Sequence, residues 1–183
     1  LHAVCYPGAR LLVLSAGQHT PAIVAAQLTQ HGFGQSPIII LERLGGAHER
    51  RVEGTAASWD AVEVAGLHTI AITCIADPEI TGFSRLAGLP DTAYHHDGQL
   101  TKREVRAMTL AALAPLPGQL LWDVGAGCGS IGIEWMRSNA RCRAIAIEPH
   151  PTRLQYIANN AVALGTPNLT IVAGEAPAAL KDL

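Results

Sequence analysis

A glycine-rich turn between two apolar runs constrains the fold more than any other feature of this sequence. The apolar run Leu120–Val124 leads into a turn with Gly125, Gly127 and Gly129, and a second apolar run ends at Glu148. An apolar strand, a glycine turn, a helix and a second strand that ends in an acid are the parts of a parallel α/β nucleotide site. The sequence therefore predicts an α/β domain with a ligand site at the carboxyl ends of its strands.

The spacing of the glycines narrows the choice of ligand. In the dinucleotide fingerprint G-x-G-x-x-G the third glycine would fall at position 130, which is Ser130. The sequence has G-x-G-x-G instead, with Ala126 inside the turn and Asp123 two residues ahead of it. This arrangement resembles the first motif of S-adenosylmethionine-dependent methyltransferases, and we expect that cofactor rather than a dinucleotide.

Each part of S-adenosylmethionine has a candidate partner in the sequence. The glycines allow the backbone to approach the ligand, and the helix that follows presents free N–H groups to its carboxylate. Asp123 is placed to receive the ammonium group, and Glu148 to accept hydrogen bonds from both ribose hydroxyls. After the third strand, Glu175 with the adjacent Ala176 is placed to reach the adenine. No catalytic residue can be named from the sequence.

Composition excludes several classes of protein. The 183 residues are 49% hydrophobic and 15% charged, which suits one or two small globular domains. The net charge of -2 gives no field to attract nucleic acid, so we expect no such partner. The apolar runs are shorter than the roughly 20 residues of a membrane helix, and we expect a cytoplasmic protein without a membrane partner.

The cysteines and histidines do not form a metal site in the sequence. Four cysteines are scattered without C-x-x-C spacing, and the adjacent His95 and His96 cannot share one helical face. We therefore expect neither a metal nor a disulfide framework, and interpret most of the cysteines as buried thiols.

The first half of the chain alternates apolar runs with one clear helix. The predicted strands of a mainly parallel sheet are Leu11–Leu14, Pro37–Leu41 and Thr69–Ile75. Thr20 is predicted to cap a helix that Gly32 terminates, with Pro21 in its first turn. A weaker helix is predicted from Ala56 to Val64.

The periodic spacing of apolar residues is lost between Ile80 and Leu100. We therefore place a linker at residues 81–100, between domains 1–80 and 101–183. Within it, Tyr94, His95 and His96 are interpreted as solvated loop residues, with substrate contact as the alternative. A capping box at Thr101–Glu104 is predicted to open a helix that runs to Leu113.

The second domain has the pattern of two βαβ crossovers. The predicted strands are Gln119–Val124, Arg143–Ile147 and Leu169–Val172, and the predicted helices are Ser130–Arg137 and an amphipathic stretch from Leu154 to Leu164. Two right-handed crossovers give the strand order 3-2-1. Trp122 and Trp135 are expected in the core. The first strand has no partner for its free edge, so we expect further strands to be missing from this chain.

Motifs in both halves resemble one family, the decarboxylating precorrin-6Y C5,15-methyltransferases. In the second half the resemblance rests on GLPDTAYHHDGQLTKREVRA, LLWDVGAGCGSIGIEW, AIAIEPHPTRLQYIANNAVALG and VAGEAPAAL. In the first half, LSAGQHTPA and LERLGG followed by HER resemble the second lobe of a tetrapyrrole methylase module. The fold class is then a partial tetrapyrrole methylase lobe followed by the first strands of a Rossmann-like class I methyltransferase sheet.

The resemblance implies a role in cobalamin biosynthesis. Members of this family transfer two methyl groups from S-adenosylmethionine to C5 and C15 of a precorrin, a tetrapyrrole, and decarboxylate its ring C acetate. The resemblance assigns the C15 methylation and the decarboxylation to the C-terminal domain, with Gln99 and Thr101 near the cofactor. A cap of the following helix is the alternative role for Thr101. A homo-oligomer is expected.

The chain departs from the family in two respects, of which the missing later strands of the C-terminal domain are one. The chain contains no Gly-Pro-Gly, so the first lobe of the methylase module is absent, and we expect this chain to be an internal piece of the enzyme. The alternatives are a nicotinamide-dependent Rossmann oxidoreductase and a non-catalytic tetrapyrrole-binding module. Response to NAD distinguishes the first from a methyltransferase, and precorrin binding without methyl transfer distinguishes the second.

Overall fold

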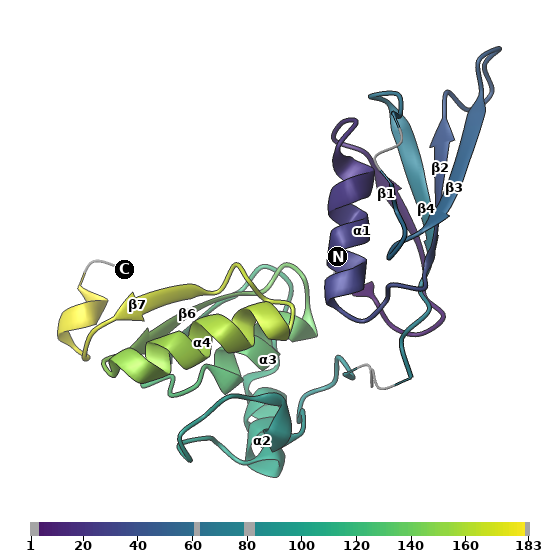
Figure 1. Cartoon of the computed structure of the whole chain (residues 1–183). Helices are drawn as coiled ribbons and strands as arrows, with labels where there is room; N and C mark the ends of the chain where they lie inside the picture. Colours follow the sequence, from purple (N-terminus) through teal and green to yellow (C-terminus); the bar gives the residue numbers. More distant parts are fainter. Residues whose placement is uncertain (1–3, 61–62, 79–82, 182–183) are drawn as a thin grey trace. The chain divides into compact units, whose positions relative to one another are not determined.

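The computed structural model describes residues 4–60, 63–78 and 83–181. The chain divides into two compact units, Leu1–Gly82 and Phe83–Leu183, each with its own hydrophobic core (Figure 1). Every helix in the described ranges is too short or too polar to span a bilayer.

The first unit is a four-stranded sheet with the helix α1 (Thr20–Gln30) beside it. Its strands are β1 (Arg10–Leu14), β2 (Pro37–Glu42), β3 (Arg50–Thr55) and β4 (His68–Thr73), in the order β1-β4-β2-β3. Alternate residues of β2 and β4 are buried with the inner side of α1, and Leu28, Ile38, Ile40 and Ile70 form the centre of this core.

The expected mainly parallel sheet is wrong for this unit, because every pairing in it is antiparallel. The strand β3 was not predicted, since its sequence RRVEGT has no apolar run. Only seven residues, 43–49, separate β2 from β3, which suits a hairpin and not a crossover. The helix expected at Ala56–Val64 is also wrong in its described part, which is a turn and irregular chain, while Ala61 and Val62 lie outside the described residues.

The helix α1 was predicted correctly apart from its cap. His19 occupies the N-cap position without a side-chain cap bond, and Thr20 is the first helical residue. The Thr20 Oγ1 instead accepts a hydrogen bond from the Ala16 N–H at 3.1 Å. Gly32 has φ +74° just after the helix, which is the left-handed ending expected there.

The second unit is built on a parallel three-stranded sheet in the order β5-β6-β7. Its strands are β5 (Leu120–Val124), β6 (Arg143–Glu148) and β7 (Thr170–Ala173), joined by the helices α3 (Ser130–Ser138) and α4 (Pro151–Ala163). The helix α4 packs along β6 and β7, and α2 (Arg103–Leu113) packs on α3 (Figure 1). The strands and helices lie within a few residues of their predicted positions, in the expected order.

The capping box predicted at Thr101 is wrong. The helix α2 begins at Arg103 after the N-cap residue Lys102, and no side chain caps it. The Thr101 carbonyl accepts a hydrogen bond from the Arg106 guanidinium, so the residues that the box would use are held in a different arrangement.

The linker expected at 81–100 is part of the second unit in its described residues, 83–100. Leu89 and Tyr94 are buried in its core, so Tyr94 is not a solvated loop residue. The short 3-10 helix η2 (Asp91–Ala93) lies between them. Buried polar side chains of α2 and α3 bind this segment, and the sequence pattern of the segment itself does not indicate them.

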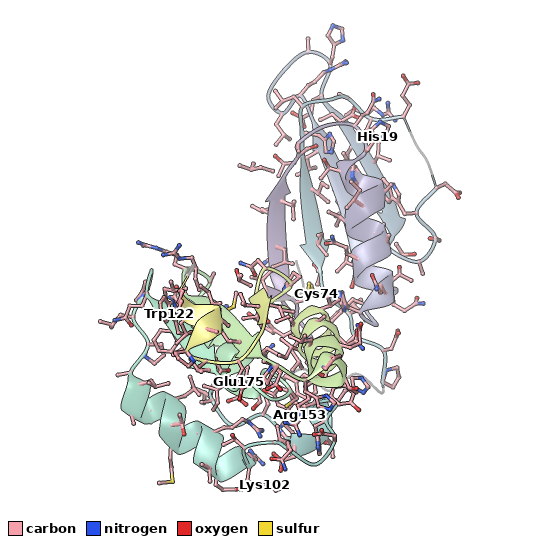
Figure 2. All side chains as sticks on the ribbon, turned by 90° about the vertical axis from the view of Figure 1, so that its left-hand side faces the viewer. His19, Cys74, Lys102, Trp122, Arg153 and Glu175 are labelled. Carbon is pink, nitrogen blue, oxygen red and sulfur yellow. The ribbon has the colours of Figure 1, made fainter. Side chains whose placement is uncertain are left out.

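The two tryptophans have different environments. Trp135 is buried as expected, and its Nε1 donates to the Arg143 carbonyl at 3.0 Å. Trp122, labelled in Figure 2, is 43% exposed, so its expected core position is wrong. It lies on β5, the edge strand of the parallel sheet, next to the similarly exposed Leu120 and Val124.

Candidate cofactor site

The glycine turn continues directly from β5 and is tied to the neighbouring strand. The N–H groups of Gly125 and Ala126 both donate to the Ile147 carbonyl, at 2.9 and 3.0 Å. Gly125, Gly127 and Gly129 have φ values of +73°, +61° and +81°, a region that favours glycine. The sequence therefore places glycine at the positions where this path requires it, and Gly129 becomes the N-cap of α3.

Glu148 holds the turn from the end of the next strand. Its side chain is 3% exposed, its Oε2 accepts from the Gly127 N–H at 2.8 Å, and its Oε1 accepts from the His150 N–H at 3.1 Å. Its backbone carbonyl accepts from the Gly174 N–H at 3.2 Å. A single residue thus connects the carboxyl ends of β5, β6 and β7.

Asp123 adds a second carboxylate to this edge of the sheet. Its Oδ2 accepts from the Gly132 N–H in the first turn of α3 at 3.0 Å. Burial raises the pKa of Asp123 above its usual value, the negative charge of Glu148 raises it further, and the hydrogen bond from Gly132 opposes both. Two partly desolvated carboxylates that repel each other are suited to a ligand with a positive charge.

The residues expected on either side of the turn have different degrees of contact with it. The Gln99 carbonyl oxygen would lie 3.5 Å from a Cβ added to Gly127, so the backbone of residue 99 lies directly against the turn. The Gln99 side chain and Thr101 are exposed. Glu175 and Ala176 are exposed after β7, next to the Gly174 that Glu148 binds.

The structure therefore brings together Asp123, the glycine turn, Glu148 and the backbone of Gln99. It places Glu175 and Ala176 at the same edge of the sheet, after the third strand (Figure 2 labels Glu175). The Thr101 carbonyl accepts a hydrogen bond from the Arg106 guanidinium, outside the turn.

One residue beside the turn was missed by the sequence analysis. Asn160 on α4 is fully buried, and its Nδ2 donates to the carbonyls of Cys128 and His95, both at 3.0 Å. Its Oδ1 accepts from the His95 N–H at 2.8 Å. A signal was present, because Asn160 lies between Ile157 and Ala161 on the apolar side of the predicted amphipathic helix.

The site residues fit an adenosyl cofactor with a cationic group. A Cβ added to Gly125 would meet no atom within 4 Å, so open space lies against the backbone of the turn. The carboxylates of Asp123 and Glu148 supply negative charge beside that space, and Glu148 retains lone pairs beyond the two that its backbone partners use. Within the described ranges no group of three or more metal-ligating side chains is found.

A parallel α/β sheet with a glycine turn, the buried Glu148 and the half-buried Asp123 at its strand ends is typical of Rossmann-like nucleotide-cofactor domains. Comparison with known proteins narrows this class. The precorrin methyltransferase domain family matches residues 92–183, half of the chain. The chain therefore belongs to the precorrin methyltransferase family.

Named relatives are similar over nearly all of the chain. A precorrin-6Y C(5,15)-methyltransferase [decarboxylating] of Sinorhizobium sp is 49% identical over 178 residues, which are 97% of this chain and 43% of that protein. The protein of the same name from Mycobacterium tuberculosis is 44% identical over 184 residues, 99% of this chain and 45% of that protein. The chain thus spans less than half the length of these relatives.

A solved structure matches about half of the chain. It is the C-terminal domain of precorrin-6Y C5,15-methyltransferase from Rhodobacter capsulatus, 49% identical, with a TM-score of 0.52 over 55% of this chain and 54% of that domain. The methyltransferase-like α/β fold expected from the glycine turn is confirmed. The likeness to the second lobe of a tetrapyrrole methylase stays a prediction for the first unit.

Proposed function

We propose that the second unit binds S-adenosylmethionine at the edge formed by Asp123, the glycine turn and Glu148, and that this binding serves methyl transfer to a precorrin. The observation that carries the proposal is Glu148, a buried carboxylate that binds the Gly127 N–H and lies at the end of the strand next to the turn. The names of the relatives support the substrate class.

Each residue of the proposed site has a distinct task. Glu148 fixes the turn and accepts hydrogen bonds from the ribose hydroxyls with its remaining lone pairs. Asp123 attracts the ammonium group, and the glycine turn with the start of α3 receives the carboxylate. The residues Gln99, Thr101, Glu175 and Ala176 border the adenosine.

The methyl transfer itself needs little chemical assistance from protein side chains. S-adenosylmethionine, when bound, supplies a methyl group on a sulfonium, so that a neutral thioether is the leaving group. The protein contributes alignment of the methyl acceptor and exclusion of water, which are the main sources of rate for such a transfer. This explains why the site is made of binding residues and why no catalytic residue stands out.

We assign the C15 methylation and the decarboxylation of the ring C acetate to the unit with the glycine turn. The first unit is proposed to be part of a tetrapyrrole methylase-like module for C5, with the division of domains close to residue 82. The proposal places the protein in the cytoplasm as a homo-oligomer. Its small-molecule partner is the precorrin.

A calorimetric titration tests the cofactor assignment. We expect saturable binding of S-adenosylmethionine to the chain and no competition by NAD. Stabilisation by NAD together with indifference to S-adenosylmethionine would establish the oxidoreductase alternative instead. For the reaction, the full-length protein is incubated with labelled cofactor and a precorrin; precorrin binding without transfer of label would support a non-catalytic tetrapyrrole-binding module.

A further inference from the structure

Residues 95–99 lie across the glycine turn and are held there by side chains of α4. The closest approach to the turn is the Gln99 carbonyl oxygen, 3.5 Å from the position of a Cβ on Gly127. We call residues 95–99 the cover segment. Its position defines one side of the space next to the turn, so whatever fixes this segment also shapes that space.

The first attachment of the cover segment is buried. Asn160 pairs its amide with both backbone groups of His95, at 2.8 and 3.0 Å, and donates a third bond to the Cys128 carbonyl inside the turn. One side chain therefore binds the cover segment and the turn at once. Such a bidentate amide fixes both the distance between His95 and α4 and the orientation of the His95 backbone, because the N–H and the carbonyl of His95 must each meet their partner on Asn160.

The second attachment is at the surface, about two turns nearer the start of α4. The Arg153 Nε donates to the Asp97 Oδ2 at 2.9 Å, and the Asp97 Oδ1 accepts from the Gln99 N–H at 3.1 Å. The hydrogen bond with Arg153 lowers the pKa of the Asp97 carboxyl below its usual value. Arg153 is labelled in Figure 2. This ion pair connects α4 to the residue whose carbonyl lies against Gly127.

The chain on either side of the cover segment is anchored independently of α4. Tyr94 donates its hydroxyl to the Glu134 Oε1 at 3.0 Å, and the same oxygen accepts from the Arg106 Nε at 2.9 Å. Arg106 is fully buried and also binds the Thr101 carbonyl. Both ends of the cover segment are thus fixed by the core, and Asn160 and Arg153 determine the path between them.

We propose that Asn160 and Arg153 are positioning residues for the cofactor, which hold the cover segment so that S-adenosylmethionine is bound between it and the strand ends. This inference rests on the proposed function. When the attachments are lost, a fraction of molecules has the cover segment displaced, and the apparent affinity falls in proportion to the fraction that remains competent.

The exposed ion pair gives the sharpest test. Arg153→Asp and Asp97→Arg each place two like charges opposite one another, while the double exchange restores an ion pair in the reverse sense. We expect each single variant to weaken S-adenosylmethionine binding about two- to fivefold, the range of an exposed ion pair. The double variant should bind more tightly than either single variant, although Asp97→Arg still removes the acceptor of the Gln99 N–H. The control is Arg141→Met, an exposed arginine of the same unit outside the cover segment.

Loss of the buried attachment, Asn160, should weaken S-adenosylmethionine binding more than loss of the ion pair. Asn160→Ala removes three hydrogen bonds and is expected to weaken binding about tenfold or more. Asn160→Asp keeps the acceptor for the His95 N–H but loses both donated bonds, so it should not rescue the affinity. Thermal unfolding separates a loss of affinity from a loss of the folded unit.

Hydrogen exchange without ligand reports the cover segment directly. In the Arg153→Asp and Asn160→Ala variants, the amides of His95 and Gln99 should exchange faster, while those of α3 are unchanged. Faster exchange with unaltered affinity would overturn the inference and leave the proposed function intact. Failure of the unaltered chain to bind S-adenosylmethionine would overturn the proposed function, and this inference with it.

Discussion

In each unit a strand leads through a five-residue turn into a helix, β1 into α1 and β5 into α3, and the two turns are stabilised differently. The turn from β1 to α1 is tied mainly by its own residues: Ser15 Oγ donates to the Gly17 carbonyl at 2.8 Å and accepts from the Gly17 N–H at 3.0 Å, and Thr20 Oγ1 accepts from the Ala16 N–H. One backbone bond, from the Ser15 N–H to the His68 carbonyl at 3.3 Å, reaches the neighbouring strand β4. The turn from β5 to α3 is tied mainly to the neighbouring strand, where the Ile147 carbonyl and the Glu148 carboxylate accept its N–H groups. One bond, from the Gly129 N–H to the Ala126 carbonyl at 2.8 Å, lies within the turn.

The difference shows what a ligand site requires beyond a strand, a glycine and a helix. The first turn satisfies its polar groups locally with short side chains, as ordinary loops do. The second turn instead uses a buried carboxylate from the adjacent parallel strand, and a second carboxylate, Asp123, repels it. Maintaining two such groups is costly without a counter-charge, which is why we place the cofactor at the second turn.

Removal of the Glu148 carboxylate should have the largest effect. Glu148→Ala takes away the acceptor of the Gly127 N–H and the proposed ribose bonds, and bonds to a charged group are each worth about 1.5–3 kcal/mol. We expect S-adenosylmethionine affinity to fall by one to two orders of magnitude, measured by calorimetry. The matched control is Glu42→Ala, because Glu42 is a buried acid at the end of β2 that accepts from the Ala65 N–H at 2.7 Å. Equal losses of S-adenosylmethionine affinity in Glu148→Ala and Glu42→Ala would contradict the assignment of the cofactor to the second turn.

A methyl group in the glycine turn should have the next largest effect. Gly127→Ala adds left-handed strain of roughly 1–2 kcal/mol and places a Cβ 3.5 Å from the Gln99 carbonyl, in the space proposed for the cofactor. Gly118→Ala has the same kind of strain, with φ +90° and no atom within 4 Å of the added Cβ. Both variants should lose stability in thermal unfolding, and only Gly127→Ala should lose affinity, about tenfold. A cofactor that binds Gly127→Ala normally does not lie against this turn.

Acidification should weaken binding earlier than an ordinary aspartate would allow. The pKa of Asp123 is raised by burial and by Glu148, so its carboxylate takes up a proton at a higher pH than usual. Protonation removes the attraction for the ammonium group, and affinity falls as the pH is lowered through that raised pKa. Calorimetry over a pH series measures this loss, expected to be a few-fold, and Asp123→Asn should give a flatter profile. An affinity that rises on acidification would exclude this role for Asp123.

The smallest effect on binding is expected at the first turn. Ser15→Ala removes two local hydrogen bonds and should lower the free energy of unfolding of its unit by about 0.5–1.5 kcal/mol. Chemical denaturation measures that loss, and cofactor affinity should stay unchanged. A parallel loss of affinity would mean that the first turn also contributes to the site.

Sequence reasoning succeeded where a pattern repeats along the chain. The second unit consists of two βαβ crossovers, and their periodic apolar residues predicted β5, β6, β7 and the helices between them. Strand direction in the first unit was missed because an apolar run such as Pro37–Leu41 reads the same in parallel and antiparallel sheets. The charged strand Arg50–Thr55 obtains its structure from pairing with β2, which local sequence does not reveal.

The unpredicted parts of the site depend on partners far away in the sequence. Glu148 could be placed at a strand end from the pattern alone, but its bond to Gly127 and that of Asn160 to Cys128 span 21 and 32 residues. Arg106 and Glu134, which bind the segment before the turn, also pair across a long stretch of sequence, 28 residues. From sequence alone, charged residues such as Arg106 and Glu134 are expected on the exposed face of a helix, and only the tertiary contact shows that they are buried.

Nuclear magnetic resonance on the isotopically labelled chain tests the central claim most directly. Addition of S-adenosylmethionine should shift the amide signals of Gly125–Gly129, His150 and Gly174, and leave those of Ser15–Thr20 unmoved. Shifts confined to the first turn, or none at all at saturating cofactor, would contradict the assignment of the site to the glycine turn of the second unit.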